Sequence, residues 1–176
     1  MLRWVGFDQA ALLDGGLKVW TAEGRPLSTE PATRAARHLT PAPRPQLIAD
    51  RDEVLASIDD GAVSIIDTMP EEYYRGEKTL YQRPGHIPGA SNANALNLFD
   101  ESGRYRPEEE LANLIDGDRN ARTITYCGGG IMASSSAFVM TRLGFTNVAV
   151  YTASLQEWAA DPANPMVVDT PGAENS

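Results

Sequence analysis

Short apolar runs alternate with amphipathic segments through most of the chain after residue 46. Runs rich in β-branched and aromatic residues, typical of buried strands, lie at 63–67, 123–126 and 148–151. Apolar residues at helical spacing predict helices at 49–57, 70–74, 107–115, 133–143 and 154–160. Strands and helices that alternate with short connections predict an α/β fold with a mainly parallel central sheet.

The two ends of the chain carry similar sequences at a constant offset of 138 residues. Residues 2–20 align without a gap with residues 140–158, and glycine, phenylalanine, alanine, leucine and tryptophan coincide. Each copy predicts a helix end, a Gly-Phe turn, a short buried strand and a second helix with Leu and Trp on one face. The alternative is a chance similarity between two short apolar patterns.

If the repeat is real, the chain opens inside the closing section of an earlier domain copy. We therefore expect residues 1–25 to be a truncated remnant of a preceding domain. Its strand at residues 10–13 would have lost its sheet neighbours, which leaves backbone groups unpaired unless the segment docks elsewhere.

The rest of the chain divides by composition. Residues 26–46 are rich in proline and weakly apolar, which predicts a semi-extended linker. Residues 47–168 contain the alternating strands and helices and form the complete domain. Residues 169–176 are polar and predict a disordered tail.

Cys127 is the only cysteine in 176 residues and lies in the sequence TYCGGGIMA, between a predicted strand and a predicted helix. Consecutive glycines let the backbone curl so that several amides point into one small bowl. The dipole of the following helix adds to the preference of that bowl for an anion. A thiolate, a persulfide or an anionic substrate would be stabilised there. The alternative is that Cys127 is a small buried hydrophobic residue.

Composition excludes several function classes. The net charge is -9 and no lysine- or arginine-rich run occurs, so nucleic acid is a poor partner. One cysteine and two separated histidines, His38 and His86, offer no zinc-type spacing, so we expect no metal. No stretch approaches the about 20 apolar residues that span a membrane, and the N-terminus lacks a signal-peptide core. We expect a soluble, cytoplasmic protein, because one cysteine forms no internal disulfide and suits a reducing compartment.

Four features together resemble the rhodanese-type sulfurtransferases. They are the strand ending at Asp67 with PEEYYRG at 70–76, GHIPGA at 85–90, the Cys127 loop, and the closing block from Gly144 to Trp158. The resemblance covers roughly residues 47–168. Residues 13–24 are similar to the closing segment of another such domain, which points to the tandem thiosulfate and 3-mercaptopyruvate sulfurtransferases, with the missing first domain as a partner if the chain is truncated.

The resemblance implies a rhodanese-like three-layer fold and a two-step transfer. Cys127 would take a sulfane sulfur from a small-molecule or protein donor, form a persulfide and pass the sulfur to a nucleophilic acceptor. The amides of the loop would surround the terminal sulfur of the persulfide without a cofactor. The residues that supply these amides are Gly128, Gly129, Gly130, Ile131 and Met132.

The loop departs from the patterns of both subfamilies. Thiosulfate-using members carry cationic side chains in this loop, and mercaptopyruvate-using members carry Cys-Gly-Ser-Gly-Val-Thr. In this chain Gly129 stands in place of the serine and Met132 in place of the threonine. The family's Asp-x-Arg is here DTM at 67–69, and Tyr73 stands where the mercaptopyruvate type has an arginine. A protein persulfide that contacts Ile131 and Met132 is therefore a further candidate donor.

Three other residues are candidates for supporting the site. Asp67 ends a strand, where it serves the site or caps a neighbouring turn. His86 acts in acid–base chemistry or holds its Gly-His-Ile-Pro-Gly turn through the backbone. Arg75 supports the pocket or lies in solvent.

Other functions compete with sulfur transfer. A cysteine phosphatase needs an arginine six residues after the cysteine, where this chain has Ala133, and a nucleotide-binding P-loop needs a Lys-Ser or Lys-Thr after the glycines. The remaining alternative is a non-catalytic rhodanese module that binds a partner or senses persulfides.

Overall fold

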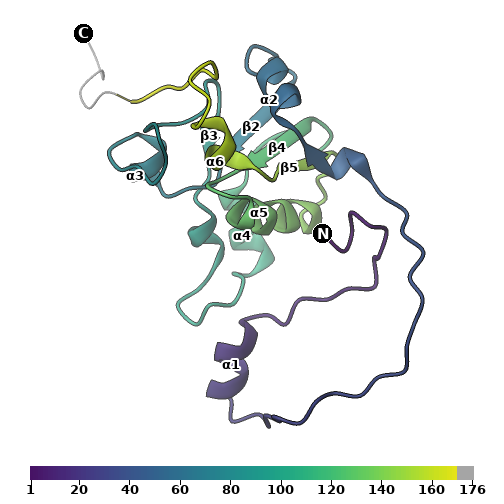
Figure 1. Cartoon of the computed structure of the whole chain (residues 1–176). Helices are drawn as coiled ribbons and strands as arrows, with labels where there is room; N and C mark the ends of the chain where they lie inside the picture. Colours follow the sequence, from purple (N-terminus) through teal and green to yellow (C-terminus); the bar gives the residue numbers. More distant parts are fainter. Residues whose placement is uncertain (170–176) are drawn as a thin grey trace.

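The computed structural model describes residues 1–169, and a five-stranded sheet forms its centre. All neighbouring strands are parallel, and β4 is the middle strand. The strands, in the order β1-β5-β4-β2-β3, are β1 (Ile48–Ala49), β5 (Val148–Tyr151), β4 (Arg122–Tyr126), β2 (Val63–Asp67) and β3 (Ser91–Asn92). The predicted α/β fold with a parallel sheet is confirmed (Figure 1).

Helices cover both faces of this sheet. They are α2 (Arg51–Ser57), α3 (Glu71–Tyr74), α4 (Glu108–Leu114), α5 (Ile131–Arg142) and α6 (Ser154–Trp158), with 3-10 turns η1 (Pro45–Leu47) and η2 (Ala95–Leu98). Helices α4 and α5 pack in the core cluster that contains Ile66, and α2 and α6 pack in the cluster that contains Ile65. Because adjacent strand residues point to opposite faces, the result is three layers.

Local sequence explains where these elements begin and end. The Asp50 side chain accepts a hydrogen bond from the Glu53 amide at 2.8 Å, which caps the start of α2. Gly144 follows α5 with φ +91°, a conformation that ends a helix without a steric penalty. The Asp50 cap and Gly144 therefore keep the connections between neighbouring strands and helices short.

The start of the first helix after residue 46 was predicted wrongly. Ala49 belongs to β1 and not to a helix, because Asp50 caps α2 and the residues before it pair with β5. The two-residue strand β3 was not predicted. The other elements predicted after residue 46 are present, with ends that differ by at most two residues.

The Gly-Phe turn of the N-terminal segment has the same backbone hydrogen bonds as its counterpart 138 residues later. Gly6 has φ +86° and Gly144 has φ +91°. The matched hydrogen bonds are Gly6 N to Arg3 O at 3.0 Å and Phe7 N to Leu2 O at 2.9 Å, against Gly144 N to Thr141 O at 3.2 Å and Phe145 N to Met140 O at 3.0 Å.

The helices of the two copies also correspond. Helix α1 (Gly16–Ala22) begins with φ +59° at Gly16, and α6 begins with φ +53° at Ser154. The indole of Trp20 donates to Pro26 O at 3.0 Å, and that of Trp158 donates to Pro165 O at 2.9 Å. The expected strand at residues 10–13 is absent from the described structure, since no strand lies beside it to pair with.

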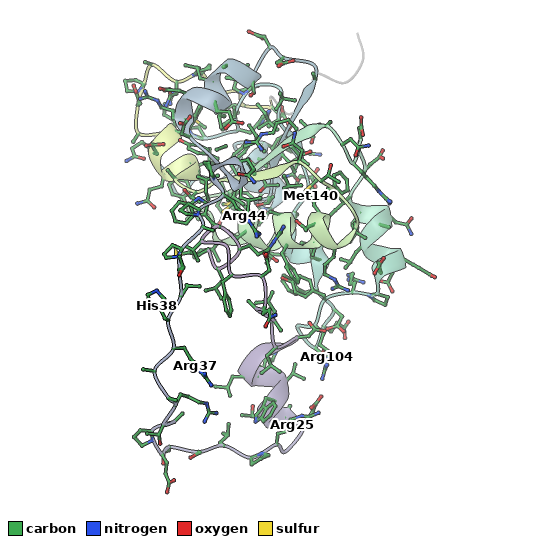
Figure 2. The ribbon with its side chains drawn as sticks, turned by 90° about the vertical axis from the view of Figure 1, so that its right-hand side faces the viewer. Arg25, Arg37, His38, Arg44, Arg104 and Met140 are labelled. Carbon is green, nitrogen blue, oxygen red and sulfur yellow. The ribbon has the colours of Figure 1, made fainter. Side chains whose placement is uncertain are left out.

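Residues 1–46 run outside the α/β body for most of their length (Figures 1 and 2). The linker is mostly exposed, and Figure 2 shows Arg37 and His38 on it, away from the sheet. Arg44 anchors its end through hydrogen bonds to both carboxylate oxygens of Asp8, at 2.6 and 2.5 Å.

At the other end, the Asp169 amide donates to Arg75 O at 3.1 Å, so this first residue of the predicted disordered tail is bonded to the domain. Residues 170–176 of that tail lie outside the described part of the chain. Among residues 1–169, no helix has the length and apolar character required to cross a membrane.

Candidate active site

Cys127 follows the last residue of β4 and is 2% exposed. Because β4 is the central strand, the carboxyl ends of β2 and β5 lie on either side of the cysteine. This edge of a parallel sheet is where ligands bind in α/β folds. The thiol is therefore buried, and the ends of two neighbouring strands lie on either side of it.

The loop after Cys127 bends back onto the sulfur. The Gly130 amide donates to Cys127 Sγ across 3.2 Å. Four other amides of the loop donate no hydrogen bond to any group in residues 1–169. They are the amides of Gly128, Gly129, Ile131 and Met132. One amide donates to the sulfur, and the amides next to it have no acceptor. An anionic sulfur species requires such an arrangement of donors.

A Cβ atom at two of the three loop glycines would clash with a neighbouring group. Gly130 has φ +82°, and a Cβ atom there would lie 2.6 Å from the Thr152 carbonyl oxygen. A Cβ atom on Gly128 would lie 1.9 Å from the Tyr81 hydroxyl. Gly129 is exposed, and a Cβ atom there would have an ordinary contact at 3.5 Å with Gln156 Oε1. The backbone requires glycine at position 130, whereas the clash at position 128 is with the end of the Tyr81 side chain.

The first turn of α6 holds the other side of the loop. The Leu155 amide donates to Cys127 O at 3.0 Å, and the Gln156 amide donates to Gly128 O at 2.9 Å. The Cys127 amide donates to Ser154 Oγ at 3.2 Å, and the Ser154 hydroxyl donates to Tyr151 O at 2.7 Å. Helix-start amides lack intrahelical acceptors, so this contact satisfies them and fixes the loop.

Asp67 lies at the end of β2, opposite Tyr126 of β4, and is completely buried. Its Oδ1 accepts a hydrogen bond from the Met69 amide at 2.8 Å, whereas Oδ2 has no hydrogen-bond partner in the described structure. Burial raises the pKa of Asp67 to about 6, although the Met69 amide and the nearby Tyr126 hydroxyl oppose the shift. Asp67 thus caps the turn that leads to α3.

His86 and Arg75 are not arranged for chemistry on the sulfur. The His86 ring is buried, stacks on Tyr74 with centroids 3.8 Å apart, and has Nδ1 2.8 Å from Tyr74 O. Its backbone exchanges hydrogen bonds with Val167 at 2.9 Å. Arg75 is exposed and pairs with Glu71. These contacts favour the structural role for His86 and the solvated one for Arg75.

Tyr81 and Arg83 lie in the connection between α3 and His86, and sequence reasoning missed both. The half-buried Tyr81 ring packs on the core cluster that contains Cys127. Desolvation, and then the charge of Cys127, raises the pKa of the Tyr81 hydroxyl. The Arg83 guanidinium donates to the carbonyl oxygens of Trp158, Ala159, Asp161 and Asn164 at 2.6–3.0 Å. No sequence motif marks these two residues.

The outer part of the loop is apolar. Ile131 is 84% exposed, and Met132 is partly buried against both core clusters. In residues 1–169, no three His, Cys, Asp or Glu side chains come together as a metal site would need. The described structure places backbone amides of the loop and the Ser154 and Tyr81 side chains around the cysteine.

The fold and this cysteine loop agree with a family match. The model of the rhodanese-like domain matches residues 50–161, well over half of the chain. The chain belongs to the rhodanese-like family.

Curated relatives carry sulfurtransferase names. A Mycobacterium bovis protein named "Putative thiosulfate sulfurtransferase 1" is 37% identical over 168 residues, which cover 88% of this chain and 60% of that protein. A Pseudomonas aeruginosa protein named "Probable 3-mercaptopyruvate sulfurtransferase" is 30% identical over 172 residues, which cover 94% of this chain and 61% of that protein. The chain thus spans about three fifths of the length of these relatives.

Solved structures show the same fold. EanB with a cysteine persulfide, described as a tetrahedral intermediate state with ergothioneine, has a TM-score of 0.85 and 25% identity, and the match covers 96% of this chain and 44% of that chain. An anaerobic ergothioneine biosynthesis enzyme from Chlorobium limicola has a TM-score of 0.81 at 24% identity, over 96% of this chain and 43% of that chain.

Proposed function

We propose that the protein is a sulfurtransferase that carries a sulfane sulfur on Cys127 as a persulfide. The observation that carries this proposal is the 3.2 Å contact from the Gly130 amide to Cys127 Sγ, inside a loop whose other amides have no acceptor in residues 1–169. Backbone amides aimed at an anion stabilise charge without a metal or a cofactor. The thiosulfate and 3-mercaptopyruvate sulfurtransferase names of relatives support the same chemistry.

The transfer has two steps, loading of sulfur onto Cys127 and delivery to an acceptor. The Cys127 thiolate attacks the outer sulfur of thiosulfate or of a persulfide, where a sulfur–sulfur bond breaks, or the single sulfur of 3-mercaptopyruvate, where the carbon–sulfur bond breaks. A sulfur–sulfur bond forms at Cys127 while the donor's bond to that sulfur breaks, and the leaving group departs with the electron pair. An acceptor nucleophile then attacks the outer sulfur of the persulfide, and the Cys127 thiolate is regenerated.

The structure of EanB with a cysteine persulfide supports a persulfide intermediate on this fold. In the present chain the corresponding role falls to Cys127, the only cysteine. A lone thiol suits a reducing compartment, and on that ground we assign the reaction to the cytoplasm.

A second candidate is a persulfide-sensing module that loads sulfur but does not turn over. Its support is that two arginines after β2 are engaged elsewhere, since Arg83 is bonded to four carbonyl oxygens and Arg75 is paired with Glu71. The rate of thiocyanate formation from cyanide and each sulfur donor separates the two functions. An enzyme forms many equivalents per Cys127, and none after Cys127→Ser. A single equivalent from the wild type contradicts the enzymatic function.

A further inference from the structure

The Tyr81 hydroxyl lies against the cysteine loop. The 1.9 Å between Tyr81 Oη and a Cβ atom built on Gly128 means that the hydroxyl occupies the space that a side chain would fill. The same Cβ position lies 2.9 Å from Tyr81 Cζ and 3.2 Å from Tyr81 Cε2, so the edge of the phenol ring also lies against the loop. The absence of a side chain at Gly128 therefore lets the Tyr81 hydroxyl lie close to the backbone of the cysteine loop.

The Tyr81 hydroxyl is a neutral hydrogen-bond donor without an acceptor in residues 1–169. It makes no hydrogen bond to any group in residues 1–169, whereas the backbone of Tyr81 is bonded to Thr79 Oγ1. Desolvation and the charge of Cys127 raise the pKa of the hydroxyl, so it keeps its proton at neutral pH. A phenol in this state stabilises a developing negative charge nearby.

Cationic side chains in the same connection are occupied. Lys78 pairs with Glu72 at 3.5 Å, and Arg83 is bound by carbonyl oxygens. The loop itself contributes only glycines, Ile131 and Met132. A dianion such as thiosulfate finds no counter-charge here, and the net charge of -9 repels it.

Resting on the proposed function, we propose that Tyr81 is a substrate-facing catalytic residue and that the donor is the persulfide of a thiol with little net charge. The Cys127 thiolate attacks the outer sulfur of the donor R–S–SH, so that Cys127–S–SH forms and R–S⁻ leaves. The Tyr81 hydroxyl donates a hydrogen bond to the departing R–S⁻, and the new persulfide loses its proton to water to become the anion that the loop amides bind.

The test is the second-order rate constant for loading sulfur onto Cys127, followed by intact mass. The donors are cysteine persulfide, generated in solution, and thiosulfate at equal concentration. Tyr81→Phe keeps the ring but removes the donor, and Tyr105→Phe is the matched control, because Tyr105 packs on the other core cluster and its hydroxyl is bonded to Ser135. We expect Tyr81→Phe to lower the rate constant with cysteine persulfide about tenfold, the effect of one hydrogen bond to a charged group. We expect Tyr105→Phe to leave it within a factor of two.

We also expect the wild type to load from cysteine persulfide at least about 100-fold faster than from thiosulfate, because a missing ion pair costs a few kcal/mol. Equal rates for Tyr81→Phe and the wild type overturn the role of Tyr81. Faster loading from thiosulfate overturns the donor class. Loading of the wild type by neither donor overturns both parts of this proposal. Loading by 3-mercaptopyruvate in that case would retain the proposed sulfurtransferase function, and no loading by any of the three donors would remove it.

Discussion

The Ser154 hydroxyl accepts a hydrogen bond from the Cys127 amide at 3.2 Å and donates one to Tyr151 O at 2.7 Å. Ser154 has φ +53° and is the one residue other than glycine with positive φ in the described chain. In the N-terminal copy, where no cysteine loop is present, Gly16 has the corresponding conformation. Ser154 therefore keeps a strained backbone because its hydroxyl holds the amide of the cysteine.

Substitutions of Ser154 separate strain from hydrogen bonding. Ser154→Ala loses the hydroxyl and retains the strain, and we expect it to lower the free energy of unfolding by about 2 kcal/mol. Ser154→Gly also loses the hydroxyl but relieves about 1 kcal/mol of left-handed strain, so it should cost less. Urea unfolding of both variants measures the order. An alanine variant more stable than the glycine variant contradicts the assigned strain.

Gly130 should tolerate alanine far less well than Gly129. A Cβ atom at Gly130 meets the Thr152 carbonyl oxygen at 2.6 Å in a left-handed backbone, and both faults lie in rigid main chain. We expect Gly130→Ala to cost about 3 kcal/mol of stability and to slow sulfur loading of Cys127. Gly129→Ala, at an exposed position, should change stability by less than about 0.5 kcal/mol. Equal effects in urea unfolding argue against a loop fixed by Gly130.

Asp67 should make stability fall as the pH rises through the weakly acidic range. Its pKa in the folded protein is about 6, above the usual 3.8, so the folded state binds the proton more tightly than the unfolded state. The resulting penalty is absent below about pH 4, grows between pH 4 and 6, and is complete above, where it amounts to roughly 3 kcal/mol.

Asp67→Asn removes this titration and retains an acceptor for the Met69 amide. We expect the variant to gain about 2 kcal/mol relative to the wild type at pH 7.5, and clearly less at pH 4.5, in urea unfolding. A difference between variant and wild type that is the same at both pH values contradicts a raised pKa for Asp67.

Arg83 should matter for stability because it joins the connection after α3 to the segment after α6. Its guanidinium has hydrogen bonds to four carbonyl oxygens, which Arg83→Ala leaves without that donor. We expect a loss of about 3 kcal/mol in chemical unfolding. The matched control is Arg75→Ala, whose exposed pair with Glu71 should be worth less than about 0.5 kcal/mol. Comparable losses in the two variants contradict a structural Arg83.

The sequence predicted the parallel α/β fold and the place of Cys127, because β-branched strands and the glycine run are local signals. It missed β1 at Ile48–Ala49, since a two-residue edge strand leaves no periodic pattern and forms only by pairing with β5. It also missed Tyr81, because an irregular connection brings this residue onto the loop from 46 positions earlier. The repeat did contain a signal for Ser154, whose counterpart is glycine.

The most direct test of the persulfide on Cys127 is the intact mass of the full chain after treatment with thiosulfate, 3-mercaptopyruvate or cysteine persulfide. We predict that at least one donor adds the mass of one sulfur atom, that peptide mapping locates it on Cys127, and that reduction removes it. Cys127→Ser should gain nothing under the same conditions. The absence of added sulfur with every donor, or equal addition to Cys127→Ser, would contradict the account.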